Sequence, residues 1–388
     1  MVFSKKHDFL GEITQPFALY IHIPFCTEKC SYCDFYSLKY KKKILKDYLK
    51  SLKKELKIYS TKIDSKIKTI YFGGGTPSLL SPKSIEEILN IIYENYLVID
   101  NIEISLESNP SSLTKEKIIA YKKVGINRLS LGIQSFNNDD LNILGRLHDR
   151  KKALSMIKEV DKQFSNYNFD LIFAIPEQNF ERWKANINKV KEINPPHLSL
   201  YNLQIEEGTM IKKQIDNNNL KPVTNELDAK MYKHAIDKLK DEDYIQYEIS
   251  NFAKKGYFSK HNLVYWRYEP YLGLGPSAHS FTTKTRFSNY SSLEKYNNHL
   301  KKDKVPIENI NSLNLQERMS EKMFLGLRLK EGINYEQFHS TFNKKLNCVF
   351  KEEINDLLEK DLLIEKDNNL KLSQKGKFLG NKVFIKFV

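Results

Sequence analysis

The sequence predicts an α/β fold, in which a partial (β/α)6 barrel precedes a smaller, winged-helix-like C-terminal α+β domain. Between residues 17 and 205, six short apolar runs alternate with longer amphipathic segments. This alternation is typical of parallel strands joined by right-handed crossovers, and six units are two fewer than a closed eight-unit barrel has. The tail instead contains helices followed by a hairpin. In such barrels the functional groups lie at the carboxyl ends of the strands.

The predicted strands are spaced so that a helix fits between each pair. After the first strand, Leu45, Leu49, Leu52 and Leu56 recur at steps of three or four residues, which predicts an amphipathic helix. The strands are expected at 17–25, 69–75, 101–108, 128–135, 169–176 and 197–205. Polar or glycine-rich clusters follow four of them, at 26–33, 73–77, 107–110 and 134–136.

The alternation of strands and helices ends after about residue 220. A helix is expected at 225–239, then an aromatic-rich stretch at 247–281, and a hairpin at 362–373 that turns at Asn368 and Asn369, before a final helix from Gln374. We therefore divide the chain into three parts, a barrel domain at 1–245, a connecting segment at 246–300 and a C-terminal domain at 301–388.

Composition excludes several classes of protein. With 40% hydrophobic and 28% charged residues, the 388-residue chain can bury a sizeable core and is not disordered. The net charge of +14 could indicate a nucleic-acid partner, but only eight of the 62 basic residues are arginines, and the lysines are scattered as on solvated helix faces. There is no apolar run of about 18 residues and no secretory signal. We expect a cytoplasmic protein without a transmembrane segment.

Three of the four cysteines, Cys26, Cys30 and Cys33, are spaced C-x3-C-x2-C in the loop after the first strand. Thiolates at this spacing converge on one soft metal centre. A structural zinc would need a fourth ligand, for which His22 is the nearby candidate. A [4Fe–4S] cluster would instead keep one iron open for an exogenous ligand. The isolated Cys348 is expected to be a buried apolar residue.

The surrounding motifs resemble the radical S-adenosylmethionine superfamily, in particular its oxygen-independent coproporphyrinogen oxidase branch. The second strand ends in a glycine run, where backbone groups can approach a ligand closely. The motifs that carry the resemblance are YIHIPFCTEKCSYCDF (20–35), YFGGGTPS (71–78), EISLESNP (103–110), GINRLSLGIQSF (125–136), DLIFAIPEQ (170–178) and HLSLYNLQIEEGT (197–209). Ala174 stands where that family usually has glycine.

Two further features resemble the HemW group of haem chaperones within that branch. The segment HNLVYW (261–266) fits the H-N-x-x-Y-W pattern of the group. In addition, Phe35 occupies the position two residues after the third cysteine, where the oxidases have a fourth cysteine. These features favour a chaperone, with coproporphyrinogen III oxidase as the alternative, so whether the chain is an enzyme stays open.

The resemblance implies a [4Fe–4S] cluster and S-adenosylmethionine, which an injected electron would cleave to a 5′-deoxyadenosyl radical. The three cysteines would bind the cluster. Carboxylates suit the amino group and ribose of the cofactor, whereas Arg146 suits its carboxylate. The resemblance assigns Tyr20 and Tyr32 to the cluster surroundings, Gly74, Gly75 and Thr76 to the methionine end of the cofactor, and Glu107, Gln134, Arg146 and Asp170 to its charged and ribose groups.

Haem requires an apolar slot, an axial donor and cations for its propionates. The segment HNLVYWRY (261–268) offers His261 as the axial nitrogen or as a residue that fixes the porphyrin. If the segment is a strand, Tyr265 and Trp266 face opposite sides and only one of them can stack on the porphyrin. The expected partners are haem, a haem-accepting protein and a reductant protein, and a second copy of the chain is a further candidate. A zinc-stabilised nucleic-acid binder is disfavoured, because residues 300–388 contain no arginine cluster.

Overall fold

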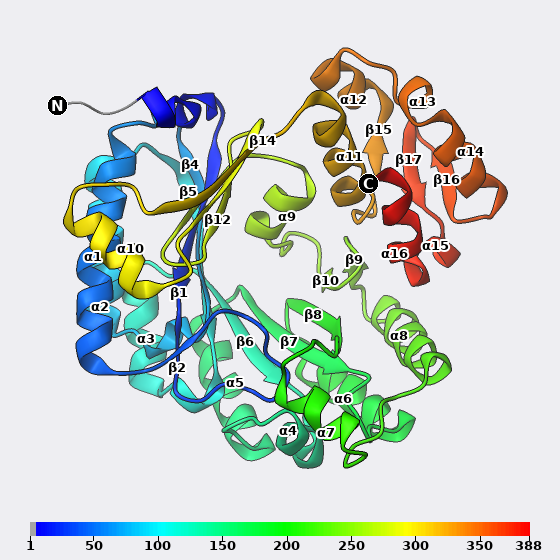
Figure 1. Ribbon diagram of the computed structural model, residues 1–388. Helices are drawn as coiled ribbons and strands as arrows, with labels where there is room; N and C mark the ends of the chain where they lie inside the picture. Colours follow the sequence, from blue (N-terminus) through cyan, green and yellow to red (C-terminus); the bar gives the residue numbers. More distant parts are fainter. Residues whose placement is uncertain (1–4) are drawn as a thin grey trace.

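One large sheet organises the computed structural model, which describes residues 5–388 (Figure 1). At its centre, six parallel strands lie in the order β1, β4, β5, β6, β7 and β8. Their bounds are β1 Phe17–Ile23, β4 Ile67–Gly74, β5 Val98–Ser108, β6 Arg128–Gln134, β7 Tyr167–Phe173 and β8 His197–Asn202. Every strand expected between residues 17 and 205 is present, and the (β/α)6 prediction is confirmed.

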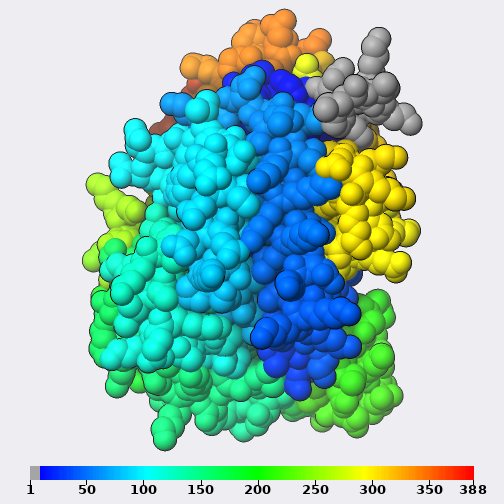
Figure 2. Space-filling model, turned by 90° about the vertical axis from the view of Figure 1, so that its left-hand side faces the viewer, coloured from blue at the N-terminus to red at the C-terminus, as the bar shows by residue number. Residues whose placement is uncertain are grey.

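Helices cover the outer face of the sheet, where α1, α2 and α3 lie side by side (Figure 2). Leu45, Leu52 and Leu56 of α1 are buried against the sheet, as their spacing predicts. Most of these helices begin after a Ser, Thr, Asn or Asp side chain that accepts a hydrogen bond from a free backbone N–H of the first turn. The helices are α1 Lys42–Ser60, α2 Pro82–Asn95, α3 Lys115–Lys123, α4 Asn138–Ile143, α5 Arg150–Gln163, α6 Phe180–Ile193, α7 Met210–Asp216 and α8 Asn225–Lys240.

Residues 245–312 extend the sheet at both edges. β11 pairs in parallel with β1, and β12, β13 and β14 follow as antiparallel strands, whereas β10 and β9 continue the sheet beyond β8. The predicted domain boundary at 301 is therefore too early, because β14 hydrogen-bonds to β13 of the barrel sheet. The elements are β9 Ile245–Gln246, β10 Asn251–Ala253, α9 Lys260–Trp266, β11 Tyr271–Leu274, β12 His279–Phe281, β13 Thr285–Asn289, α10 Leu293–Lys301 and β14 Ile307–Ser312.

From Leu315 onward, helices and a three-stranded sheet surround a second core, which also includes Tyr268 and Phe281 of the preceding segment. The predicted hairpin is present, but it turns at Asp367 and Asn368, one residue earlier than expected. Both have positive φ (55° and 58°), which Asp and Asn tolerate in tight hairpin turns. The elements are α11 Leu315–Gly326, β15 Ile333–Asn334, α12 Tyr335–Phe342, α13 Leu346–Val349, α14 Lys351–Glu359, β16 Leu363–Lys366, β17 Asn369–Leu372, α15 Gln374–Phe378 and α16 Gly380–Phe384.

Cys348 corrects another expectation, because its side chain is exposed rather than buried. The short helix α13 buries Leu346, and a residue two positions further along a helix faces away from that side.

The remaining short elements are β2 Phe25–Cys26, β3 Leu38–Lys39, η1 Lys5–Glu12, η2 Pro77–Leu79, η3 Pro110–Ser112 and η4 Ile385–Phe387. Within residues 5–388, none of the helices combines the length and apolarity that crossing a bilayer requires.

Glu55 of α1 joins the outer helices to the added edge strands. Its fully buried carboxylate accepts hydrogen bonds from Tyr296 Oη (2.6 Å), Asn289 Nδ2 (2.6 Å) and the Gly275 backbone N–H (2.9 Å). Burial raises the pKa of Glu55 to about 7, although the three donors act in the opposite direction.

This pKa predicts a pH-dependent stability. Because the pKa in the folded state lies above that of the unfolded chain, the contribution of Glu55 to stability is complete at acidic pH and is lost as the pH rises through about 7. We expect Glu55→Gln to remove about 1 to 3 kcal/mol of pH dependence in the free energy of unfolding, measured by urea denaturation between pH 5.5 and 8. Glu86→Gln on the exposed face of α2 is the control, and identical pH slopes for both variants would contradict the assignment.

Candidate functional site

A cavity of about 560 Å³ opens at the carboxyl ends of the parallel strands, where the sequence predicts the functional groups. The loop after β1 and the ends of β4, β5, β6 and β7 contribute to its wall. The predicted site residues that line it are Cys26, Cys30, Tyr32, Cys33, Gly74, Gly75, Thr76, Glu107, Gln134, Arg146 and Asp170. The fold therefore brings together residues that lie up to 144 positions apart in the sequence, from Cys26 to Asp170.

The three cysteines lie half-buried on one loop. The loop is tied to its surroundings by Ser31, whose N–H donates to the Leu144 carbonyl (3.1 Å) and whose carbonyl accepts from the Ile211 N–H (2.9 Å). Burial raises the pKa of Cys26 and Cys33. A cationic metal centre would lower these pKa values, so metal binding at this loop would release protons.

The glycine turn after β4 packs directly against the first cysteine. A Cβ atom at Gly75 would lie 2.7 Å from the Phe25 carbonyl oxygen and 3.0 Å from Cys26 Sγ, so only glycine fits there. Thr76 Oγ1 donates to Cys26 Sγ at 3.6 Å. The turn thus supports the thiol and keeps the floor of the cavity open.

Two charged side chains, Arg146 and Glu107, also line the cavity. Arg146 donates to Cys30 Sγ (3.2 Å) and to the Gly132 carbonyl (2.9 Å), while its buried Nε has no partner among the described residues. Glu107 accepts from Tyr71 Oη (2.8 Å) and from the Gly74 N–H (3.0 Å). Burial raises the pKa of Glu107 to about 7.

Two polar residues complete the wall on β6 and β7. Asp170 accepts from Ser130 Oγ (3.0 Å) and Asn168 Nδ2 (2.7 Å), and burial raises its pKa. Gln134 has a positive φ of 65°, which is uncommon for this residue type, and its buried Oε1 has no partner within residues 5–388. Backbone strain of this kind often occurs at functional sites.

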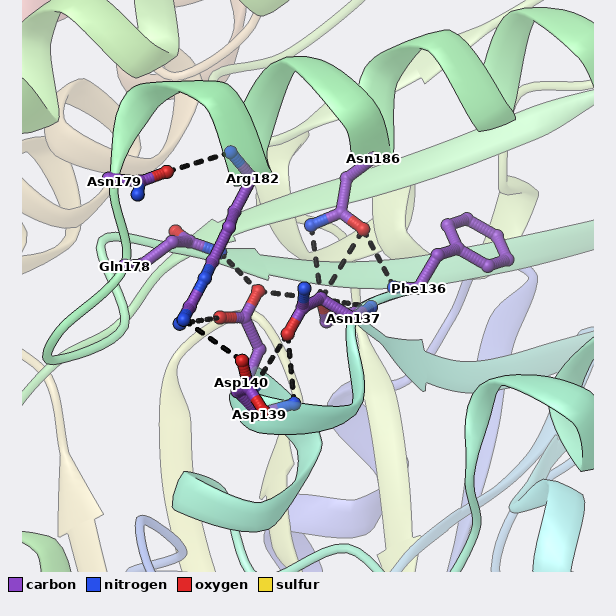
Figure 3. Close-up of polar contacts among 9 residues, drawn as sticks. Phe136, Asn137, Asp139, Asp140, Gln178, Asn179, Arg182 and Asn186 are labelled. Carbon is purple, nitrogen blue, oxygen red and sulfur yellow. Dashed lines mark hydrogen bonds and ion pairs between the residues drawn. The ribbon is translucent and has the colours of Figure 1, made fainter.

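A buried polar network fixes the turn that follows Gln134 (Figure 3). Asp140 is fully buried and accepts from Ser135 Oγ (2.8 Å) and Gln178 Nε2 (2.8 Å), and Arg182 forms an ion pair with it at 3.6 Å. The network ties α4 to α6, and the chain after α4 leads to Arg146. Sequence analysis missed this network, although the run NNDD (137–140) after the fourth strand was a signal for it.

Tyr20 is not among the residues that line the cavity, and its assignment to the cluster surroundings stays a prediction. Its hydroxyl pairs with His22 Nδ1 (3.0 Å), and its half-buried ring lies 6.2 Å from that of Tyr71. Tyr71, which sequence analysis missed, takes the position at the wall instead. Tyr71 lies two residues before Gly73 on β4, so both residues are on the inner face of the strand, and this spacing could have predicted the position of Tyr71.

His261 also lies outside the cavity, and its segment is helix α9 rather than a strand. Ser259 caps this helix by accepting from the Asn262 N–H, which explains why the aromatic run folds as a helix. His261 is 1% exposed, and its two ring nitrogens pair with Thr69 Oγ1 and Tyr265 Oη, both at 2.8 Å.

The residues present fit a cluster with an organic ligand better than a structural zinc. His22, the fourth ligand that zinc would need, is buried beneath Gly74, and its ring nitrogens pair with Tyr20 Oη and the Tyr36 carbonyl (3.3 Å). The wall meanwhile carries carboxylates, a guanidinium and unpartnered buried polar atoms. Such groups suit a zwitterionic ligand that lies beside the thiols.

Comparison with known proteins decides the family. Residues 20–190 match the Radical SAM superfamily and residues 313–379 match the HemN C-terminal domain. The heme chaperone HemW of Bacillus subtilis is 34% identical over 372 residues, which cover 95% of this chain and 98% of the relative. HemW of Lactococcus lactis is 34% identical over 377 residues, covering 97% and 98%. The chain belongs to the HemW family of radical SAM proteins.

The solved structure of coproporphyrinogen III oxidase (HemN) from Escherichia coli has the same fold, with a TM-score of 0.85 over 98% of this chain and 92% of that one, at 21% identity. Membership of the radical SAM superfamily implies a [4Fe–4S] cluster and S-adenosylmethionine.

One departure from the family pattern also affects the backbone conformation. Ala174, where glycine is usual, has a left-handed φ of 58°, a conformation that costs a residue with a Cβ about 1 kcal/mol.

The thiols of the loop predict a simple ligand test. Replacing Cys26, Cys30 or Cys33 by Ala leaves two thiolates, which cannot hold a stable cubane cluster. We expect each variant to lose the iron and sulfide that the parent retains after anaerobic reconstitution and desalting. Cys348→Ala, at an exposed position far along the chain, is the matched control and should retain both. A triple variant that keeps the iron content of the parent would refute the ligand assignment.

Proposed function

We propose that this protein is a haem chaperone, which binds haem and transfers it to a haem-accepting protein. The observation that carries the proposal is the similarity at 34% identity, over nearly the whole of both chains, to proteins named heme chaperone HemW. A reductant protein for the cluster, a homodimer and a cytoplasmic location belong to the same proposal and rest on the sequence alone.

In this proposal Cys26, Cys30 and Cys33 bind three irons of the cluster and leave the fourth iron for S-adenosylmethionine. When bound, the cluster supplies the electron that cleaves the sulfonium of the cofactor. The Glu107 carboxylate, beside the glycine turn at 3.0 Å from the Gly74 nitrogen, takes the amino group of the methionine. Arg146, already in contact with Cys30, takes its carboxylate.

Asp170 binds the ribose hydroxyls in this arrangement, because its carboxylate lines the cavity and accepts hydrogen bonds from hydroxyl groups such as that of Ser130. Gln134 adds its unpartnered Oε1 as an acceptor for the same ligand. Tyr32 covers the cluster loop, where burial raises the pKa of its hydroxyl and keeps it protonated. Gly75 and Thr76 form the floor beneath the methionine.

Phe35 distinguishes this proposal from the alternative, oxidative decarboxylation of coproporphyrinogen III. Its side chain is 66% exposed at the rim of the cavity, at the position where the oxidases have a cysteine. A benzyl group can neither ligate a metal nor relay a proton. Because the fold shared with HemN does not distinguish haem transfer from coproporphyrinogen III oxidation, the choice depends on individual side chains. Phe35 favours the chaperone.

The location of the haem is a separate matter. His261 as the axial ligand stays a prediction, and it requires the imidazole to leave its hydrogen bonds with Thr69 and Tyr265. Arg267, a candidate for a propionate, is exposed and pairs with Glu331 at 3.2 Å. It could therefore exchange this partner for a propionate without the desolvation of a buried charge.

Two assays on one anaerobically reconstituted preparation test the function. We expect saturable haem binding with a shifted Soret band, together with no oxidation of coproporphyrinogen III despite an intact cluster. Coproporphyrinogen III oxidase serves as the positive control for turnover. Formation of protoporphyrinogen by this protein would restore the enzymatic alternative, and absence of saturable haem binding would refute the chaperone.

A further inference from the structure

Helix α9, which carries HNLVYW, lies on the concave side of the sheet, between the strands and the C-terminal helices (Figure 1). His261, at its start, is packed against the inner face of β4. Thr69 Oγ1 and Tyr265 Oη each lie 2.8 Å from a ring nitrogen. A neutral imidazole has one donor and one acceptor nitrogen, so these two hydroxyls satisfy it completely. The ring is therefore held in one orientation.

The ring of Tyr71 lies between the His261 ring and the cavity. The His261 ring stacks on Tyr71, with ring centroids 4.7 Å apart and planes inclined by 22°. The Tyr71 hydroxyl donates to Glu107 Oε1 at 2.8 Å, and the Gly74 N–H donates to the other oxygen at 3.0 Å. The stack thus determines where the Tyr71 hydroxyl lies, and this hydroxyl is one of the two donors that orient the Glu107 carboxylate.

Strand β5 connects the same two places through a second route. Glu103, four residues before Glu107 and on the same face of the strand, accepts from the backbone N–H groups of Lys260 (3.2 Å) and His261 (3.1 Å). One carboxylate of β5 therefore anchors the start of α9, and the other enters the cavity. The register of the strand fixes the distance between them.

We propose that His261 is a positioning residue for S-adenosylmethionine, which holds Tyr71 and thereby the Glu107 carboxylate that receives the amino group of the methionine. The inference rests on the assignment of Glu107 to the cofactor, and it does not depend on haem transfer. Burial lowers the pKa of His261 to about 3, so the ring is neutral and acts by packing and hydrogen bonding.

Affinity for S-adenosylmethionine, measured by equilibrium dialysis on cluster-replete protein, tests this role. We expect His261→Ala and Tyr71→Phe each to weaken binding about tenfold, equivalent to about 1.4 kcal/mol, with unchanged iron content. Because both act through one carboxylate, the double variant should bind no more weakly than Tyr71→Phe alone. Lys260→Ala, which removes an exposed side chain of the same helix and keeps its backbone donor, should bind as the parent does.

Unchanged affinity in His261→Ala, or losses that multiply in the double variant, would overturn the proposal. If His261→Ala does not fold, Tyr265→Phe replaces it in the same cycle, because it removes only the hydrogen bond at Nε2, and a loss of about threefold is expected. Haem titration of the same samples distinguishes a role of His261 in haem binding from its role in binding S-adenosylmethionine. Loss of haem affinity with intact cofactor binding would make His261 a haem residue and refute its positioning role.

Discussion

A carboxylate shielded from solvent with no cation in contact is costly, and Glu107 is such a carboxylate: it forms no ion pair within residues 5–388, although the more distant Arg128 acts to lower its pKa. Tyr71 and the Gly74 backbone donate to it, but burial outweighs both donors and raises its pKa to about 7, with a further increase from the nearby charge of Asp170. An ammonium group at this place would restore the missing opposite charge. The cavity is thus best satisfied by a ligand that brings a positive charge to the glycine turn and a negative charge to Arg146.

The alternation of side chains along parallel strands produces this arrangement. Residues two apart share a face, so Thr69 and Tyr71 on β4, and Glu103 and Glu107 on β5, all belong to a polar inner face. Polar groups on a buried face require partners. Tyr71 and Glu107, near the strand ends, line the ligand cavity. Thr69 and Glu103, earlier in the same strands, instead form hydrogen bonds with helix α9. The H-N-x-x-Y-W segment and the cofactor site are therefore two ends of one buried network.

Local sequence patterns predicted the strands, the cysteine loop and most of the cavity wall, because each depends on spacing within one segment and on the rule that strand ends converge. Tyr20 does not line the cavity although it pairs in register with Tyr71, which does, and its assignment to the cluster surroundings stays a prediction. The secondary structure of the segment at His261 was left open, because seven residues are too few to display a helical period. The Asp140 network joins helix α4 to Gln178 and helix α6, which are distant from it in sequence, and residue spacing carries no information about these contacts.

The thiolates of Cys26, Cys30 and Cys33 would hold a [4Fe–4S] cluster and leave one iron open for a ligand bound by Glu107 and Arg146. Mössbauer spectroscopy of protein reconstituted with enriched iron, recorded with and without S-adenosylmethionine, tests this central claim most directly. We expect one iron in four to change its isomer shift and quadrupole splitting when the cofactor is added, while the thiolate-bound irons keep theirs. Spectra that do not respond to the cofactor, or that change equally at all irons, would contradict the claim.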